Sequence, residues 1–347
     1  MPSQTHPSLY LDSKFGNFVL KTNKTPKPGP GELLVRIEAA GLNPVDWKIQ
    51  KYGMFIESYP VIVGTDVAGT VEEVGQGVSS FAKGDRVLYQ GSWAEDRAGY
   101  QQYNLIDAST AAKIPSNISL EEAASIPVAI GATVIGLYNP KPQGAGLVAP
   151  FEASKRGHEA GKPFFVFGGA TSVGQYVIQF AKLSGFSPII TTASLKHEQH
   201  LKSLGATHII DRHNPLSSLP DEIAKITTKP FEIVFDAISA SETQEAGYNI
   251  LSEGGTMIVV LTTQVKSLTS GKNIIHVFGV FTLPETRELG VQFYSQLEAM
   301  LKEGVIRPNR VEVVPGGLNG VVPGLERLQS DQVSGTKLIV RPQETIV

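Results

Sequence analysis

Between residues 164 and 280, short apolar runs alternate with stretches of helical periodicity, and this rhythm restricts the possible folds more than any other feature of the chain. The six runs are FFVF, SPIITT, HIID, EIVFDAI, TMIVVL and NIIHVFGV, which begin at Phe164, Ser187, His208, Glu232, Thr256 and Asn273. Strands that alternate with helices predict a parallel sheet joined by right-handed crossovers. Six strands in this order are typical of a doubly wound α/β fold that binds a nucleotide.

A glycine-rich segment follows the first of these runs. Residues Gly168–Gly174 read GGATSVG, and helical periodicity continues from there to Gly185. In the dinucleotide-binding pattern G-x-G-x-x-G, the middle glycine lets a pyrophosphate approach the backbone, and here Thr171 stands at that position. Its hydroxyl can donate to a phosphate oxygen, and the helix N-terminus offers free N–H groups. We therefore predict a dinucleotide-binding loop; a turn that merely packs the helix on the strand is the alternative. The predicted contacts are Gly168, Gly169, Thr171, Ser172, Val173 and Gly174.

The end of the second predicted strand bears on which cofactor is bound. An NAD site usually places Asp or Glu there, on the ribose hydroxyls. Here the strand ends in TTASLKH, which supplies Ser194 and Lys196 and no acid, and Arg212 follows the third strand. Hydroxyls with a cation suit a 2′-phosphate, so we predict NADPH. The alternative is that Lys196 and Arg212 are solvated surface charges.

Composition narrows the class of protein further. A length of 347 residues suggests two domains, and a net charge of −3 without blocks of like charge argues against a nucleic-acid partner. The absence of cysteine excludes disulfides, thiolate zinc sites and cysteine nucleophiles. The apolar run Ala123–Tyr138 has 16 residues, interrupted by Pro127, whereas a membrane span needs about 20. We predict a buried element, no membrane partner and a cytoplasmic location.

The two ends of the chain read as β structure. Alternating apolar residues predict a strand at Glu32–Leu42, and turns divide Gly69–Tyr89 into short strands. The ending SGTKLIVRP resembles this opening region, and Asn139–Pro163 looks like an inserted surface loop. We predict a substrate domain from residues 1–126 and 284–347, and a cofactor domain from residues 127–283.

Several further motifs occur in a recognisable order. They are GLNPVDWKIQKYG (Gly41–Gly53), YPVIVGTDVAGTVEEVG (Tyr59–Gly75) and FAKGDRV (Phe81–Val87). With the glycine loop, they resemble the medium-chain dehydrogenase/reductase superfamily over nearly the whole chain. The resemblance implies a GroES-like β-rich substrate domain and a Rossmann cofactor domain. It is strongest to the zinc-independent quinone oxidoreductase branch, and within that branch to fungal trans-acting enoyl reductases of polyketide synthesis.

Zinc-dependent members of this superfamily use a Cys and a Gly-His-Glu motif. Here the first position falls in Leu42–Val45, which has no Cys, and the second falls at Gly64–Asp66, which reads GTD. A literal GHE at Gly157–Glu159 lies in the insertion, and we interpret it as a coincidence. Catalytic zinc needs three converging protein ligands, and the histidines His197, His200 and His208 belong to cofactor-domain elements. We predict no metal.

The resemblance implies hydride transfer from NADPH to an activated double bond in a quinone, an enone or an enoyl thioester, free or carrier-linked. A polyketide synthase is then a possible partner. An NADPH-binding protein of the same fold with little or no catalysis is the alternative function. Asn43 and Lys48 would lie near the substrate, with Lys48 stabilising an enolate or meeting a carrier phosphate. Tyr52 is a further donor candidate.

The resemblance also implies additional cofactor contacts. Thr133 matches a nicotinamide contact, although a threonine that bonds its own helix backbone is an equal alternative. Other contacts, made mainly through the backbone, fall in Val259–Leu261, Phe278–Val280 and Ser334–Lys337. The individual residues predicted from these segments are Val260, Leu261, Phe278, Val280 and Lys337.

Overall fold

A computed structural model describes residues 2–266, 268–269 and 271–346, and the chain forms two compact units. The first unit runs from the N-terminus to Val128 and adds Gly290–Lys302 and the segment from Pro308 to the C-terminus. The second unit contains Ala129–Leu289 and Glu303–Arg307. These boundaries differ from the predicted ones chiefly in the helix α8 (Pro284–Glu303), which passes from the second unit into the first.

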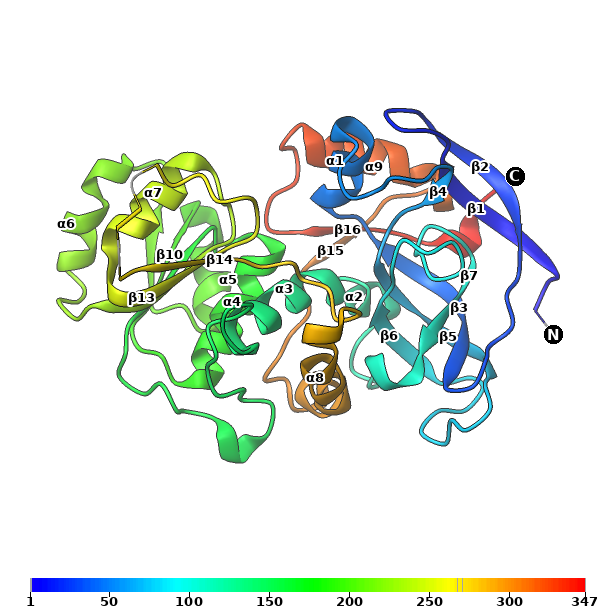
Figure 1. The fold of residues 1–347 in the computed structure, drawn as a ribbon, viewed down its shortest axis with the longest axis horizontal. Coiled ribbons are helices and arrows are strands. Elements are labelled where there is room, and N and C mark those ends of the chain that lie inside the picture. Colours follow the sequence, from blue (N-terminus) through cyan, green and yellow to red (C-terminus); the bar gives the residue numbers. More distant parts are fainter. Residues whose placement is uncertain (1, 267, 270, 347) are drawn as a thin grey trace. The chain divides into compact units, whose positions relative to one another are not determined.

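The second unit is built on a six-stranded parallel sheet in the order β11-β10-β9-β12-β13-β14. Figure 1 labels β10, β13 and β14 of this sheet. The chain order reverses between β9 and β12, so the sheet is doubly wound as the sequence predicted. Its strands are β9 (Phe164–Phe167), β10 (Ile189–Ala193), β11 (His208–Asp211), β12 (Phe231–Asp236), β13 (Leu251–Val259) and β14 (Asn273–His276).

The helices of this unit follow the predicted positions, except that α3 was predicted only as a buried element. They are α3 (Pro127–Tyr138), α4 (Ser172–Ser184), α5 (Glu198–Leu204), α6 (Leu219–Ala224) and α7 (Ser241–Ile250). Gly185 ends α4 with a φ of 93°, a left-handed conformation that glycine adopts without a Cβ clash. Gly205 ends α5 in a comparable way with a φ of 131°.

The apolar segment around α3 is a core element. Within the described residues, Leu120–Tyr138 is the one stretch long and apolar enough to cross a membrane by length and composition, and 78% of its most apolar window is buried inside the protein. A Cβ at Gly136 would lie 2.9 Å from Ile258 and 3.1 Å from Phe235, so α3 packs closely on β13 and β12. This burial explains why the helix has no polar face.

The first unit contains a seven-stranded sheet and a three-stranded sheet. The larger sheet has the order β15-β16-β3-β5-β6-β8, with β7 also paired to β3. Its strands are β3 (Glu32–Gly41), β5 (Asp66–Val74), β6 (Arg86–Gln90), β7 (Tyr103–Asp107), β8 (Ala111–Lys113), β15 (Val311–Val313) and β16 (Lys337–Val340). The smaller sheet has the order β2-β1-β4, formed by β1 (Thr5–Leu11), β2 (Phe18–Lys24) and β4 (Val61–Ile62).

The strands β16 and β3 were both expected from the sequence. The C-terminal strand β16 does return to the opening region, because Ile339 pairs antiparallel with Gly41 of β3. The predicted strand at residues 32–42 is confirmed as β3, but its alternation does not separate an exposed face from a buried one. Leu33, Leu34 and Val35 are all buried. The unit also contains the short helices α1 (Pro44–Tyr52), α2 (Leu120–Ala123) and α9 (Val321–Gln329).

The segment Asn139–Pro163 carries one short 3-10 turn, Ala153–Lys155, in its otherwise irregular backbone. It is anchored at two points. Phe151 is buried and packs edge-on against Tyr138 and Phe180. Arg156 donates two hydrogen bonds, of 2.8 and 2.9 Å, to the carboxylate of Glu303. The segment therefore lies fixed against the second unit.

Candidate functional site

The glycine loop lies at the carboxyl end of β9, where backbone atoms crowd together. Gly168 has a φ of 73°, which side-chain-bearing residues rarely adopt. A Cβ at Gly169 would lie 2.3 Å from Oγ1 of Thr191, and one at Gly174 would lie 2.2 Å from the carbonyl oxygen of Gly168. All three glycines are therefore required by the close approach of loop, strand and helix.

The loop leaves hydrogen-bond donors free at the start of α4. Thr171 caps this helix, because its Oγ1 accepts from the backbone N–H of Gly174 at 2.9 Å. The proton of the Thr171 hydroxyl therefore remains available to donate to another acceptor. In the part of the chain that the structure describes, the N–H groups of Ser172 and Val173 have no hydrogen-bond acceptor. Free first-turn amides at the positive end of a helix are suited to bind a phosphate.

This loop also lies at the point where the sheet reverses its winding direction, which is where doubly wound folds bind their ligands. On the adjacent strand, the carboxylate of Asp236 accepts from the N–H groups of Ile238 and Ser239 and from Oγ1 of Thr243, at 2.7–2.9 Å. Ser239 in turn accepts from the N–H of Val260 at 2.9 Å. These contacts give Asp236 a structural role in shaping the loops beside the glycine segment.

Ser194, Lys196 and Arg212 lie at the ends of two neighbouring strands. Ala193 of β10 pairs with Asp211 of β11, and the N–H of Arg212 donates to the carbonyl oxygen of Ala193 at 3.0 Å. Lys196 and Arg212 are exposed, and neither forms a salt bridge with a carboxylate among the described residues. The carboxylate of Asp211 accepts two hydrogen bonds from His213, which lower the pKa of Asp211.

The predicted nicotinamide contacts lie on α3 and on the segments that follow β13 and β14. Thr133 is buried, and its hydroxyl donates to the carbonyl oxygen of Ala129, one turn earlier in α3, at 3.1 Å. The same hydroxyl also lies 3.5 Å from the carbonyl oxygen of Val173 at the start of α4, and the nicotinamide contact of Thr133 stays a prediction. A Cβ at Gly279 would lie 2.7 Å from the backbone nitrogen of Ala132, so Phe278–Val280 runs along α3 next to Thr133. Val260 and Leu261 follow directly after β13.

Lys337 differs from the other predicted cofactor residues, because it belongs to the first unit and is buried there. Its ammonium group forms a 2.7 Å salt bridge with Oδ2 of Asp66 and donates a hydrogen bond to Oδ1 of Asn43. The Nδ2 group of Asn43 donates to the same Asp66 oxygen at 2.8 Å, and the N–H of Val128 donates to Oδ1 of Asp66 at 2.6 Å. We call Asn43, Asp66 and Lys337 the buried triad.

Two members of the buried triad lie in the segments where we expected the zinc ligands of zinc-dependent members to fall. Asn43 lies in the segment that lacks the cysteine, and Asp66 ends the GTD sequence that replaces GHE. The polar atoms of both residues are taken up by one another, by backbone and by the Lys337 ammonium, so this set does not fit a zinc ion. Within residues 2–266, 268–269 and 271–346, no group of three or more His, Cys, Asp or Glu side chains could hold a metal.

The three residues predicted near the substrate all belong to α1 or its start. Asn43 precedes the helix, and its polar side-chain atoms are engaged in the buried triad, which favours a positioning role. Lys48 is half-buried, with Nζ 5.6 Å from the ring centroid of Trp47, and burial lowers its pKa. It forms no salt bridge with any carboxylate that the structure describes. Tyr52 is exposed and packs on Trp47 with ring centroids 5.9 Å apart.

The sequence did not predict that Asp46 and Tyr100 lie beside the buried triad. Oδ2 of Asp46 accepts from the N–H of Asn43 at 2.8 Å and from the hydroxyl of Tyr100 at 2.6 Å, while Oδ1 of Asp46 is buried without a hydrogen-bond partner among the described atoms. Burial raises the pKa of Asp46 to about 6. The Tyr100 contact cannot be read from the sequence, because Tyr100 comes from a distant segment that only folding brings to α1.

Comparison with known proteins identifies the family. Residues 29–116 match the family described as alcohol dehydrogenase GroES-like domain, and residues 172–303 match the family described as zinc-binding dehydrogenase. The trans-enoyl reductase resD of Aspergillus sclerotiorum is 31% identical over 345 residues, which cover 90% of this chain and 93% of that protein.

Solved structures share the fold over nearly the whole length. An alcohol dehydrogenase superfamily protein from Novosphingobium aromaticivorans superposes with a TM-score of 0.80 at 23% identity, covering 97% of this chain and 99% of that one. A quinone oxidoreductase from Coxiella burnetii gives a TM-score of 0.71 at 24% identity, with coverage of 97% and 99%. The chain thus belongs to the medium-chain dehydrogenase/reductase superfamily, as an oxidoreductase of the enoyl reductase and quinone oxidoreductase type whose fold binds a nicotinamide cofactor.

Proposed function

We propose that this protein is an NADPH-dependent, zinc-independent reductase that acts on an activated C=C bond of an enoyl thioester, an enone or a quinone. The observation that carries the proposal is the grouping at the carboxyl ends of β9, β10 and β11. There the backbone amides at the start of α4, Ser172 and Val173, have no acceptor among the described residues. They lie at the same edge of the sheet as Lys196 and Arg212, which form no salt bridge there. This arrangement suits a dinucleotide with an additional phosphate.

Each part of the grouping has a distinct task in this proposal. The first-turn amides of α4 and the Thr171 hydroxyl would bind the pyrophosphate. Ser194, Lys196 and Arg212 would bind the 2′-phosphate, where an NAD enzyme would place an acid at the end of β10. The segments Val260–Leu261 and Phe278–Val280 would border the nicotinamide through their backbone atoms. When bound, the cofactor supplies the hydride that adds to the β-carbon of the substrate.

Lys48 is the residue that we assign to the substrate carbonyl. Its ammonium is half-buried and has no carboxylate partner among the described residues, so it can donate to an oxygen that gains negative charge as the hydride adds. One such donor stabilises a developing oxyanion by about 3 kcal/mol. Water would supply the proton to the α-carbon. The buried triad, with the Lys337 ammonium in place of a metal, supports zinc-independence of this reaction.

The proposal is tested by following NADPH absorbance at 340 nm with a panel of enones, quinones and enoyl thioesters, in the presence of a chelator. We expect turnover with at least one class, undiminished by the chelator, and a loss of about 100-fold in kcat for Lys48→Met. Activity that the chelator abolishes and zinc restores would refute zinc-independence. NADPH binding without turnover on any substrate would instead support the binding protein of the same fold.

The partner and the cellular location complete the proposal. Because the relatives are named trans-enoyl reductases, we propose that the unsaturated substrate is linked to the carrier domain of a polyketide synthase. A cytoplasmic location agrees with this role.

A further inference from the structure

Exposed aromatic side chains and lysines gather where the β1–β2 turn meets the end of α1. Phe15, Tyr52 and Phe55 are 62%, 53% and 50% exposed. The turn and the helix are in direct contact, because Nε2 of Gln50 donates to the carbonyl oxygen of Gly16 at 2.9 Å. Together with Lys14, Lys48 and Lys51, the three exposed aromatic residues form what we call the α1 patch.

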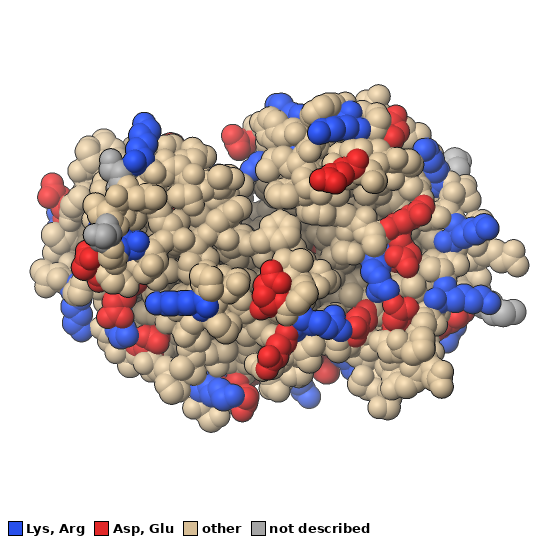
Figure 2. All heavy atoms as spheres, in the orientation of Figure 1, with Lys and Arg blue, Asp and Glu red and all other residues tan. Residues whose placement is uncertain are grey.

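The lysines of the α1 patch lie over aromatic rings instead of beside carboxylates. Nζ of Lys14 is 5.4 Å from the ring centroid of Phe15, and Nζ of Lys51 is 5.9 Å from those of Trp47 and Tyr52. Neither these two lysines nor Lys48 forms a salt bridge with a described carboxylate. Figure 2 shows both blue and red atoms on the surface over the region where Figure 1 labels α1. The patch therefore carries three lysines that form no salt bridge among the described residues, and one exposed carboxylate, Glu57, lies near Lys14.

The backbone holds two of these rings in an unfavourable conformation. Phe15 and Phe55 have φ values of 64° and 65°, two of the four positive values among the described residues other than glycine. Such a conformation is strained for a residue with a side chain, and strain of this kind clusters at binding sites. Both rings nevertheless remain at least half exposed.

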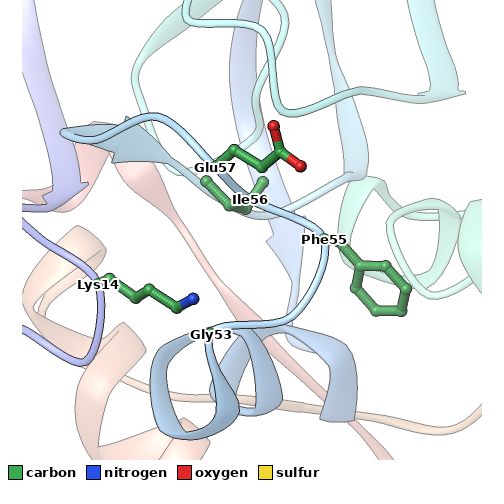
Figure 3. A pocket seen from close by; sticks show the side chains of 5 residues that line it. All are labelled: Lys14, Gly53, Phe55, Ile56 and Glu57. Carbon is green, nitrogen blue, oxygen red and sulfur yellow. The ribbon is translucent and has the colours of Figure 1, made fainter.

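A pocket of about 370 Å³ opens within the patch, lined by Lys14, Gly53, Phe55, Ile56 and Glu57 (Figure 3). Lys14 reaches across from the β1–β2 turn toward Gly53, while Phe55 points away from it at the other end of the loop. Phe55 stacks on Trp93 with ring centroids 5.7 Å apart, and Nε1 of Trp93 has no hydrogen-bond partner among the described atoms. The pocket is thus lined by one cation, one aromatic ring and one carboxylate.

We propose that the α1 patch docks an acidic carrier domain that presents the enoyl group on a phosphopantetheine arm, an inference that rests on the proposed function. Lys14 and Lys51 would pair with carboxylates of the carrier and with the phosphate of the arm, while Lys48 keeps its place at the substrate carbonyl. The exposed rings would pack on the apolar surface between them, as aromatic side chains do in interface centres. A second copy of this chain fits poorly, because a symmetric contact would place these lysines against each other.

The test compares two substrates with the same enoyl group. One is the crotonyl form of an acidic carrier domain from a fungal polyketide synthase, and the other is the crotonyl thioester of N-acetylcysteamine, which has neither protein nor phosphate. The variant Lys14→Glu/Lys51→Glu should raise KM for the carrier substrate about tenfold and leave kcat/KM for the small thioester unchanged. Raising the salt concentration should reduce the difference between variant and wild type.

Two further variants separate docking from folding. Lys24→Glu changes an equally exposed lysine at the far end of the same hairpin, where Lys24 pairs with Thr5, and should leave both substrates unaffected. Phe55→Gly removes the ring and accepts the positive φ without strain, so it should raise KM for the carrier substrate alone.

Several results would overturn the docking surface. They are an equal KM for both substrates in the wild type, an equal loss on both in the lysine variant, and a dimer that the lysine variant disperses in sedimentation. Titration with the holo carrier domain, which needs no turnover, separates this inference from the proposed function. If the wild type binds the holo carrier domain, the lysine variant binds it more weakly, and neither substrate is reduced, the proposed reductase activity is refuted and the docking surface stands.

Discussion

Asp46 and Asp66 bring two carboxyl groups into one buried cluster at the start of α1. Asp66 is neutralised by the Lys337 ammonium at 2.7 Å. Asp46 has only neutral donors, the Tyr100 hydroxyl and the Asn43 amide, among its described hydrogen bonds. Burial raises its pKa to about 6, and these bonds lower it less than burial raises it.

This difference predicts a dependence of stability on pH. The folded-state pKa of Asp46, about 6, exceeds the ordinary value of 3.8, so the folded chain binds this proton more tightly than the unfolded chain. Asp46 therefore adds up to about 3 kcal/mol to the free energy of unfolding below pH 3.8. This contribution is lost as the pH rises through about 6. Urea unfolding between pH 4 and 7 should show that Asp46→Asn removes this decline.

The exposed aspartate Asp221 of α6 provides the control for that series. Asp221→Asn should unfold with the same pH profile as the wild type. If Asp46→Asn also keeps the wild-type profile, Asp46 is not the buried group that titrates in this window.

A second prediction at the residue scale concerns cofactor choice. Lys196→Ala with Arg212→Ala should raise Kd for NADPH by about 10- to 100-fold, or about 1.4–3 kcal/mol, while Kd for NADH stays the same. The reason is that the 2′-phosphate alone would contact both cations. Fluorescence titration with the two nucleotides measures the effect. Lys202→Ala, whose lysine pairs with Glu198 at 2.7 Å on the neighbouring helix, is the control. Equal losses for both nucleotides would contradict the assignment.

At the scale of elements, the contact between β9, the glycine loop and α4 decides whether phosphate-binding amides are presented. Gly174 occupies the first turn of α4, and in an ordinary helix alanine is favoured over glycine by about 1 kcal/mol. Here a Cβ would lie 2.2 Å from the carbonyl oxygen of Gly168, which is backbone and cannot rotate away. The local preference and the packing requirement therefore oppose each other.

We expect the packing requirement to prevail. Gly174→Ala should lower the free energy of unfolding by about 1–3 kcal/mol and weaken NADPH binding, because helix and strand must move apart. Thermal unfolding and nucleotide titration measure the two effects. Gly29→Ala is the matched control, since its Cβ would meet the flexible end of the Glu32 side chain at 3.1 Å. Equal stability of Gly174→Ala and the wild type would show that the loop adapts without cost.

Across the whole chain, the buried triad connects regions that are remote in sequence. It ties the C-terminal strand β16 to the start of α1 and to β5, and through the N–H of Val128 to the start of α3. Removing one member of a buried ion pair leaves the other charge uncompensated and costs about 3–5 kcal/mol. The triad should therefore act as a structural unit.

A double-mutant cycle tests this unit. Lys337→Met should lower the free energy of unfolding by about 3–5 kcal/mol, and the double variant Lys337→Met/Asp66→Asn should recover part of that loss, because no buried charge remains. Urea unfolding of the wild type, both single variants and the double variant gives the coupling energy. Additive losses would contradict the triad.

The sequence by itself determined the doubly wound sheet, the position of the glycine loop, the caps at Gly185 and Gly205, and the family. These features depend on local patterns, namely apolar periodicity and glycine at fixed spacing, and such patterns are visible in the amino-acid sequence. Tertiary structure alone decided that Lys337 pairs with Asp66, that Asp46 is buried beside Tyr100, and that Phe15 lies beside the end of α1. Each depends on which side chains packing brings together from distant segments, and on how much water that packing removes.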